Sequence, residues 1–466
     1  MLEDDAAGDA AGNGTGPSGV PPVAAPGDPA SEAPEERPLR VALFTDMYGP
    51  GHSGLLYAVQ FLEGELLAAG FEVEVVAPAC DGPNPYRDHP GRSELRLPSL
   101  RLPGLPMAVA NGRGFEAALE RFAADPPDVI HVHGLGTVGL LGVWAADRAE
   151  VPLMVTWHTD FEAYADHYSA LAPFLDAYYR LLRVTTNGMK RPALKDMRRW
   201  LSVRWLHRGM SRRNLINAAH DMLEAADLVT TPSDKTAVRV RELAPGSHIR
   251  VVPNGADALP PGPPLAPASG PRILYVGRIA AEKNIELLID AFAWVREEIP
   301  DAELMIVGDW RTAKVLEQRL RRARRRGGVT LVGQVPRDQL TPYYESADVF
   351  AFPSLTDTQA LVLHEAAHAG LPIVSVDDEL RLVVDEGVNG LFARPTPEAL
   401  ARQLVRMLIR LEDPEFRARA QARSREMASW WTIERQSADI IEMYRALAER
   451  RVVPESMHAI PPTAAS

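Results

Sequence analysis

Short apolar runs alternate with longer amphipathic segments along most of this chain. The apolar runs predict buried strands, and the segments between them, with apolar residues at helical spacing, predict helices. In the first half the expected strands are 40–46, 73–76, 128–133, 153–157, 227–231 and 249–252. In the second half they are 273–277, 304–308, 330–333, 349–352 and 373–376. This alternation predicts an α/β fold with two mainly parallel sheets, each covered by helices on both faces.

A stretch rich in Pro, Gly and Ala separates the two halves. It predicts a first domain over 39–256, a linker over 257–271 and a second domain over 272–430. A last helical pattern covers about 431–450. The two ends, 1–38 and 451–466, have little apolar surface to bury, and we expect both to be disordered.

Composition and charge narrow the class of protein. A chain of 466 residues with 46% hydrophobic content suits two or three domains with large cores. Its net charge of −12 argues against a general nucleic-acid binder, so no nucleic-acid partner is expected. Cys80 is the only cysteine, which excludes an intrachain disulfide and a cysteine-based metal cluster. No basic, apolar leader and no apolar run of membrane length is present, so we expect a cytoplasmic protein.

The segment 349–370 carries the strongest functional signal. Asp357 lies in a polar turn after a buried strand, and Glu365 follows eight residues later inside the next helix. Both carboxylates are expected to face the crevice at the carboxyl end of the strand, where open α/β sheets bind ligands. Free backbone amides at the helix N-terminus favour a phosphate, and they belong to Ala360, Leu361 and Val362. Carboxylates that can bind hydroxyl groups, next to amides that can bind phosphate, suit a sugar nucleotide as ligand.

Two cations follow the first strand of the second half. Arg278 comes directly after this strand, and Lys283 stands five residues later, before the next helix. A guanidinium can bridge phosphate oxygens in a forked geometry, and an ammonium group adds a compact second charge. Together they would neutralise a diphosphate leaving group, so no metal cofactor is expected. The plainer alternative is a pair of solvated charges on a loop.

Two histidines share one face of the predicted strand 128–133. His133 lies at its end, and similar histidines in a known enzyme family, described below, imply that it bonds a donor sugar or orients an acceptor. His131 is better explained as a core histidine bonded to backbone. A metal-binding pair is the alternative, but no third ligand stands out at a useful spacing, so no metal site is predicted.

A polar and aromatic patch follows the next strand, and its candidate acceptor-binding residues are His158, Asp160 and Tyr164. Such a patch suits a sugar or headgroup hydroxyl, whereas a strand-end cap over core aromatics is the alternative. Near the start of the chain, a glycine loop that ends at Gly54 precedes a helix. Glycines there allow the backbone to approach a diphosphate.

Residues 190–213 form a strongly basic segment, with nine Lys or Arg and a single acid, Asp196. Apolar residues recur within it at helical spacing. A basic amphipathic helix of this kind is attracted to an anionic membrane surface, which is the predicted partner of this segment. A solvated basic face over a local core is the alternative.

These motifs resemble the retaining glycosyltransferases of the large group 4 family, over roughly residues 40–450. The acid-x7-acid segment, the Gly-Arg-x4-Lys pattern and the His-x-His strand carry the resemblance. Trp157-His158-Thr159 is also similar to a Tyr-His-Thr segment that is frequent in members that glycosylate diacylglycerol or phosphatidylinositol. Two departures are Asp357, where Glu is usual, and Ala360, where Gly is common.

The resemblance implies a GT-B architecture, in which two Rossmann-like domains face each other across a cleft and the last helix crosses back to the first domain. It implies that Asp357 contacts the donor sugar, that Glu365 contacts the ribose and that Arg278 and Lys283 hold the diphosphate. The base would lie near backbone groups of Gln334 and Val335.

The implied activity is the transfer of a hexose from a nucleotide-diphosphate sugar, with a UDP- or GDP-hexose as donor, to a hydroxyl of a membrane lipid headgroup. Transfer on the front face of the sugar would need no metal and no covalent intermediate. The protein would act on the inner face of the membrane as a peripheral protein. Alternatives are a soluble acceptor, such as an inositol phosphate or a secondary metabolite, and a non-catalytic sugar-nucleotide-binding subunit. A retaining phosphorylase or an epimerase would use the same architecture.

Overall fold

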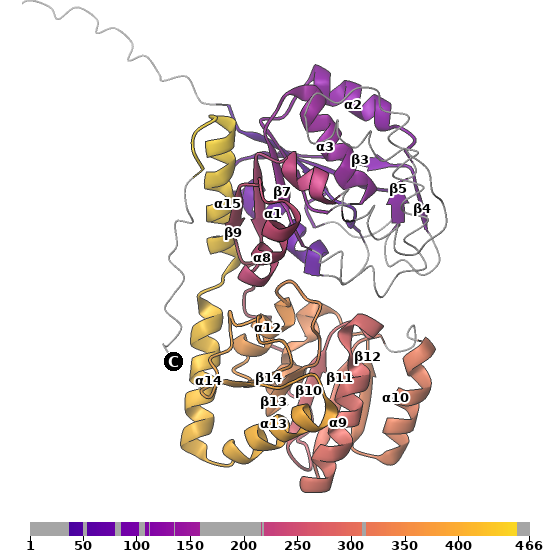
Figure 1. Cartoon of the computed structure of the whole chain (residues 1–466), viewed down its shortest axis with the longest axis vertical. Coiled ribbons are helices and arrows are strands. Elements are labelled where there is room, and N and C mark those ends of the chain that lie inside the picture. Colours follow the sequence, from indigo (N-terminus) through magenta and orange to yellow (C-terminus); the bar gives the residue numbers. More distant parts are fainter. Residues whose placement is uncertain are drawn as a thin grey trace, which may run out of the picture. The chain divides into compact units, whose positions relative to one another are not determined.

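The computed structural model describes residues 37–49, 54–79, 85–101, 108–110, 112–134, 136–158, 216, 219–309 and 314–453 (Figure 1). These residues contain two parallel sheets and a small antiparallel ribbon, and from Pro38 onward both parallel sheets belong to one compact unit. The ribbon pairs β4 (Ser99–Arg101) with β5 (Ala108–Ala110). Among the described residues, we find no helix of the length and apolar character that crossing a membrane requires.

The first sheet has seven parallel strands in the order β3-β2-β1-β6-β7-β8-β9. Its strands are β1 (Arg40–Phe44), β2 (Glu72–Pro78), β3 (Arg92–Leu97), β6 (Val129–Val132), β7 (Leu153–Thr156), β8 (Leu228–Thr231) and β9 (Ile249–Val251). Helices α1 (Gly54–Ala68), α2 (Phe115–Ala124), α3 (Thr137–Ala149) and α8 (Asp234–Leu243) accompany them. Side chains of β1 alternate between two cores, Ala42 and Phe44 in one and Val41 and Leu43 in the other. Both faces of the sheet are therefore covered, which explains why its central strands, such as β6 and β7, are buried along their whole length.

The second sheet has six parallel strands in the order β12-β11-β10-β13-β14-β15. Its strands are β10 (Arg272–Val276), β11 (Glu303–Val307), β12 (Val329–Gly333), β13 (Val349–Phe352), β14 (Ile373–Ser375) and β15 (Gly390–Phe392). Its helices are α9 (Ile285–Glu298), α10 (Lys314–Arg326), α11 (Thr341–Glu345), α12 (Leu361–His368), α13 (Pro397–Arg410) and α14 (Pro414–Ser429), with 3-10 turns η2 (Ala281–Lys283) and η3 (Arg337–Gln339). Strand β10 again alternates between two cores: α9, α10 and α13 contribute to one, α11 and α12 to the other.

The strand order reverses once in each sheet. The reversal lies between β1 and β6 in the first sheet and between β10 and β13 in the second. Loops from the carboxyl ends of adjacent strands diverge at such a point, and open α/β sheets bind ligands there. The predicted fold class, two Rossmann-like parallel sheets, is confirmed.

Two strands of the parallel sheets were not predicted. Strand β3 lies at the edge of the first sheet. Four of the six residues in its sequence, Arg-Ser-Glu-Leu-Arg-Leu, are polar or charged. Strand β15, also at an edge, has only three residues. Edge strands are short or polar, so they give no continuous apolar run.

The last helix, α15 (Ile433–Ala448), packs on the first sheet although it follows the second. Thr432 caps its N-terminus by accepting a hydrogen bond from the backbone N–H of Arg435. Ile440, Met443, Tyr444 and Leu447 then enter the same core as the residues of β1. This helix is therefore part of the hydrophobic core of the first half.

Candidate active site

Lys283 and Asp357 meet where the order of the second sheet reverses. Lys283 ends the turn η2 after β10, Asp357 lies in the turn after β13, and the ammonium group donates a hydrogen bond to Asp357 Oδ1. Burial opposes ionisation of Asp357, but the charge and hydrogen bond of Lys283, with Ser354 and Arg278, outweigh it and hold the pKa of Asp357 below its usual value. Asp357 is therefore ionised at neutral pH.

Arg278 lies on the same loop and is held by its surroundings. Its Nη2 lies 2.8 Å from Glu282 Oε1, and its carbonyl accepts a hydrogen bond of 2.9 Å from the hydroxyl of Tyr275. Gly277 precedes Arg278 with φ of +150°, a conformation that glycine adopts without strain. A Cβ at this position would also lie only 2.9 Å from the hydroxyl of Tyr275. Arg278 also lowers the pKa of Asp357, so both predicted cations act on this carboxylate.

Glu365 is buried in α12 and has two partners within the protein. Arg337 Nε donates to its Oε1 at 2.7 Å, and the Tyr344 hydroxyl donates to its Oε2 at 2.8 Å. Burial, and then the negative charge of Glu365, raise the pKa of Tyr344 well above its usual value, so this phenol remains a donor. Neither partner was identified from the sequence, although Arg337 stands two residues after the predicted pair Gln334 and Val335. Gln334 is exposed and Val335 half-buried, just beyond the end of β12.

The N-terminus of α12 has the conformation that glycine favours. Ala360 precedes the helix with φ of 63°, and no side chain caps this end. A Cβ on Gly54, the first residue of α1, would lie 3.9 Å from Leu361 Cδ1. The structure thus brings Gly54, Ala360, Leu361 and Val362, predicted from two distant segments, to one place.

Three histidines lie close together at the carboxyl ends of β6 and β7. His133 Nδ1 lies 3.1 Å from His158 Nε2, whereas His131 bonds to Tyr444 and Thr156 in the interior. Burial lowers the pKa of His133 well below its usual value and that of His158 to about 4, so both rings are neutral at pH 7. His133 Nε2 is buried and has no hydrogen-bond partner among the residues that the structure describes. This nitrogen of His133 is a candidate hydrogen-bonding atom for a ligand.

The loop that carries Asp357 also contacts the first half of the chain. The Thr358 hydroxyl donates to the carbonyl of His158 at 3.0 Å, and the Ser233 hydroxyl donates to the carbonyl of Thr358. Lys235 donates to the carbonyl of Leu355 at 2.8 Å and forms an ion pair with Asp377. Ser233 and Lys235 were not identified from the sequence. The signal that could have found them is their position just after strand β8, at the edge where such sheets bind ligands.

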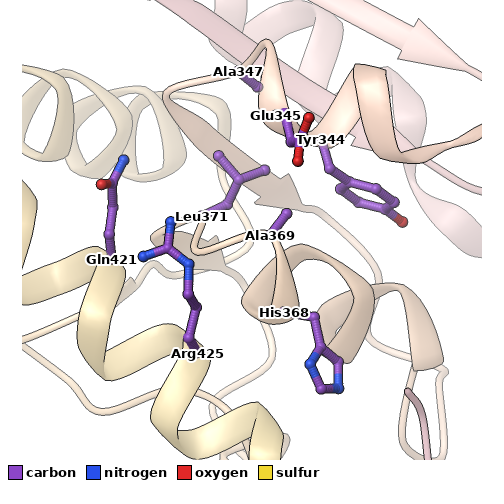
Figure 2. Close-up of a pocket in the computed structure, with 8 residues that line it drawn as sticks. All are labelled: Tyr344, Glu345, Ala347, His368, Ala369, Leu371, Gln421 and Arg425. Carbon is purple, nitrogen blue, oxygen red and sulfur yellow. The ribbon is translucent and has the colours of Figure 1, made fainter. Parts of the chain in front are cut away.

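Two cavities are lined by residues of the loops and helices that follow the strands. The smaller, of about 10 Å³, has room for about one water. It is lined by Trp157, Lys235, Thr236, Arg239, Asp357 and Thr358. The larger, of about 290 Å³, lies between α11, the end of α12 and α14 (Figure 2). None of the site residues predicted from the sequence lines it, and its guanidinium, Arg425, is exposed.

Several predicted features fall outside the described residues. These are Asp160 and Tyr164 of the acceptor patch, the basic segment 190–213 and most of the two terminal tails. Within the described part of the chain, no three His, Cys, Asp or Glu side chains are grouped so that they could hold a metal ion.

Comparison with known proteins assigns both halves to glycosyltransferases. Residues 54–258 match the model of "Glycosyltransferase Family 4", and residues 270–410 match that of "Glycosyl transferases group 1". The chain is 27% identical to alpha-monoglucosyldiacylglycerol synthase of Acholeplasma laidlawii over 400 residues, which cover 81% of this chain and 89% of that protein. It is 28% identical to D-inositol 3-phosphate glycosyltransferase of Xylanimonas cellulosilytica over 455 residues, 90% of this chain and 99% of that protein.

A solved structure shares the fold. Sucrose-phosphate synthase from Thermosynechococcus elongatus superposes with a TM-score of 0.65 at 21% identity, and the match covers 88% of this chain and 100% of that one. This structure confirms the fold, and the family models and relatives above confirm the predicted resemblance and enzyme class. The family models match both halves of the chain, and the relatives agree with them. The two parallel sheets, each with one reversal of strand order, agree as well. The chain belongs to the group 1 and family 4 glycosyltransferases of the GT-B fold.

Proposed function

We propose that this glycosyltransferase moves a hexose from a UDP- or GDP-sugar to a hydroxyl of a membrane lipid headgroup, with retention at the anomeric carbon. The observation that carries the proposal is the ion pair of Lys283 and Asp357 at the reversal point of the second sheet. In this proposal Lys283 would bind the phosphate and Asp357 the sugar hydroxyls, and the contact between them at the edge where such sheets bind ligands supports these adjacent roles.

The cations would hold the diphosphate of the donor. In the structure Lys283 is held by Asp357 and Arg278 by Glu282. A bound diphosphate would compete for both cations and leave Asp357 available to the sugar. Because the leaving group gains negative charge as its bond to the sugar breaks, preorganised cations stabilise the transition state, and we propose that no divalent metal is required.

His133 would bond the sugar or the acceptor. Its ring is neutral because of burial, and its buried Nε2 has no hydrogen-bond partner among the described residues. As the acceptor oxygen bonds to the anomeric carbon on the face from which the diphosphate departs, the leaving phosphate oxygen takes the acceptor proton. His158, Asp160 and Tyr164 remain the proposed contacts of the acceptor.

Two observations support a lipid acceptor. One relative is named for diacylglycerol glucosylation and matches 81% of this chain, and the basic segment 190–213 suits an anionic surface. We propose that the enzyme acts as a peripheral protein on such a surface. The second candidate is a soluble inositol phosphate acceptor, because the relative named for that acceptor matches 90% of this chain.

A panel of donors and acceptors tests the proposal. We expect a UDP- or GDP-hexose to raise the melting temperature, since a ligand of the folded state stabilises it. With that donor, diacylglycerol in anionic vesicles should be glycosylated and inositol 3-phosphate should not. Transfer to inositol 3-phosphate alone would replace the lipid acceptor with the soluble one. Stabilisation without transfer to either acceptor would favour a non-catalytic sugar-nucleotide-binding subunit.

A further inference from the structure

Arg337 lies between the predicted ribose-binding carboxylate and a helix of the first half. Its Nε donates to Glu365 Oε1 at 2.7 Å, and the pair is largely buried, with 19% of the Arg337 side chain and 4% of the Glu365 side chain exposed. A charge-assisted hydrogen bond in such surroundings fixes the plane of the carboxylate. Tyr344 holds the other oxygen, so Glu365 has one orientation.

The guanidinium of Arg337 also lies over two aromatic rings of α1. Its Cζ is 5.5 Å from the centre of the Tyr57 ring and 5.0 Å from that of the Phe61 ring. The two rings stack at 6.1 Å with an interplanar angle of 20°. Cation–π attraction stabilises a guanidinium in such a position over aromatic rings. Arg337 thus connects Glu365, in the second half, to α1, whose first residue is the predicted donor contact Gly54.

One nitrogen of Arg337 has no partner within the described part of the protein. Nη2 is buried and donates to no described group. A buried donor without an acceptor is unfavourable, and native structures usually supply a partner. A ligand with oxygen acceptors, bound next to Glu365, would supply it, and the ribose and base of a nucleotide carry such oxygens.

We propose that Arg337 is a positioning residue for the nucleoside of the donor. It orients Glu365 toward the ribose hydroxyls and, through Tyr57 and Phe61, makes ribose binding depend on contact between α1 and the second half. The inference rests on the proposed function, because it requires that Glu365 binds the ribose.

The test compares nucleotides with and without ribose hydroxyls. Binding of UDP and GDP, and of their 2′,3′-dideoxy forms, is measured by calorimetry on the full chain. In the wild type we expect the preferred diphosphate to bind at least about tenfold more tightly than its dideoxy form, as expected for hydrogen bonds to a charged group. In Arg337→Gln this preference should fall below about threefold, because Glu365 is no longer oriented.

Further variants separate orientation from folding. Arg337→Lys keeps a charge beside Glu365 and loses the planar stack, so we expect an intermediate preference. Arg381→Gln is the matched control, since Arg381 also lies over a ring, that of Phe392 at 4.4 Å, and is 3.5 Å from a carboxylate, that of Glu386. Its ribose preference should equal that of the wild type. Melting temperatures show which variants are folded.

Each outcome has one meaning. If the wild type prefers the ribose form and Arg337→Gln and Arg337→Lys, both folded, keep the full preference, the role of Arg337 is wrong while the proposed function stands. If the wild type does not distinguish the two forms, Glu365 does not bind the ribose, and that part of the proposed function fails together with the inference. Loss of preference in Arg337→Gln, with the control unchanged, supports the inference.

Discussion

Lys283 donates a hydrogen bond to Asp357, so the loops that follow β10 and β13 are joined by a largely buried ion pair. These loops diverge from the point where the second sheet reverses its strand order. The pair places the proposed diphosphate-binding cation in contact with the proposed sugar-binding carboxylate. In the proposed complex, donor binding would therefore exchange an internal ion pair for contacts with the ligand.

Removing either cation should slow turnover. We expect Lys283→Ala and Arg278→Ala each to reduce turnover by at least about a hundredfold, because a preorganised donor to the departing phosphate is lost. A nucleotide-release assay measures this. Arg319→Ala is the control, since Arg319 pairs with Asp290 and Glu286 on the surface and should leave the rate unchanged. Near-normal rates for both site variants would remove the diphosphate assignment.

Turnover should persist in excess EDTA. The two cations of the site are proposed to do the electrostatic work that a divalent metal does in other transferases. The same nucleotide-release assay, run with and without chelator, measures this. Complete loss of activity that added magnesium or manganese restores would contradict the proposed mechanism.

Ala360→Gly should stabilise the protein by about 1 kcal/mol, because an alanine with φ of 63° is strained and glycine is not. Urea unfolding measures the free energy of unfolding of both forms. The control is Ala369→Gly, at the other end of α12, where φ is −70° and glycine gains nothing. It should destabilise the protein. A lower stability of Ala360→Gly would show that this backbone is not strained.

Stability should fall as the pH drops from about 6.5 toward 4, in part because of His158. Burial lowers the pKa of His158 from 6.5 to about 4, so between these values the unfolded state binds a proton that the folded state does not. The contribution is fully present above pH 6.5 and is lost as the pH decreases. Replacing the ring by His158→Asn should reduce the slope of stability against pH in this window by up to about 1.4 kcal/mol per pH unit. Urea unfolding across the window measures both slopes, and equal slopes would contradict the lowered pKa.

The basic segment 190–213 should bind anionic vesicles and not neutral ones. Binding should weaken as salt rises, because screening shortens the reach of surface charge. Charge reversal at Lys195, Arg199, Arg204 and Arg208 should abolish it, since each basic residue contributes about 1 kcal/mol near such a surface. Co-sedimentation measures this, and nucleotide binding serves as the control. A wild type that ignores anionic vesicles at low salt would favour the soluble acceptor.

The sequence alone was sufficient to predict the α/β fold and to propose most of the candidate site residues. Strands buried on both faces are continuous apolar runs, as in β13, where all four residues are buried. Asp357, Arg278 and Lys283 follow such strands within a few residues, and parallel strands end at the same edge, so their proximity could be predicted. Ala360 was noticed only as a departure from glycine, and its strained conformation became visible in the structure.

Only the tertiary structure decided which groups pair. Arg337 and Glu365 are 28 residues apart, His133 and His158 are 25 apart, and Lys235 and Asp377 are 142 apart. Strand β3 was missed because it is a polar edge strand, and the structure shows how its charged side chains are accommodated. The side chain of its Arg92 is only 2% exposed and pairs with Glu63 of α1, a contact that local periodicity does not encode. Periodicity reports which face of an element is buried, whereas the partner of a charged side chain depends on how distant loops and helices meet.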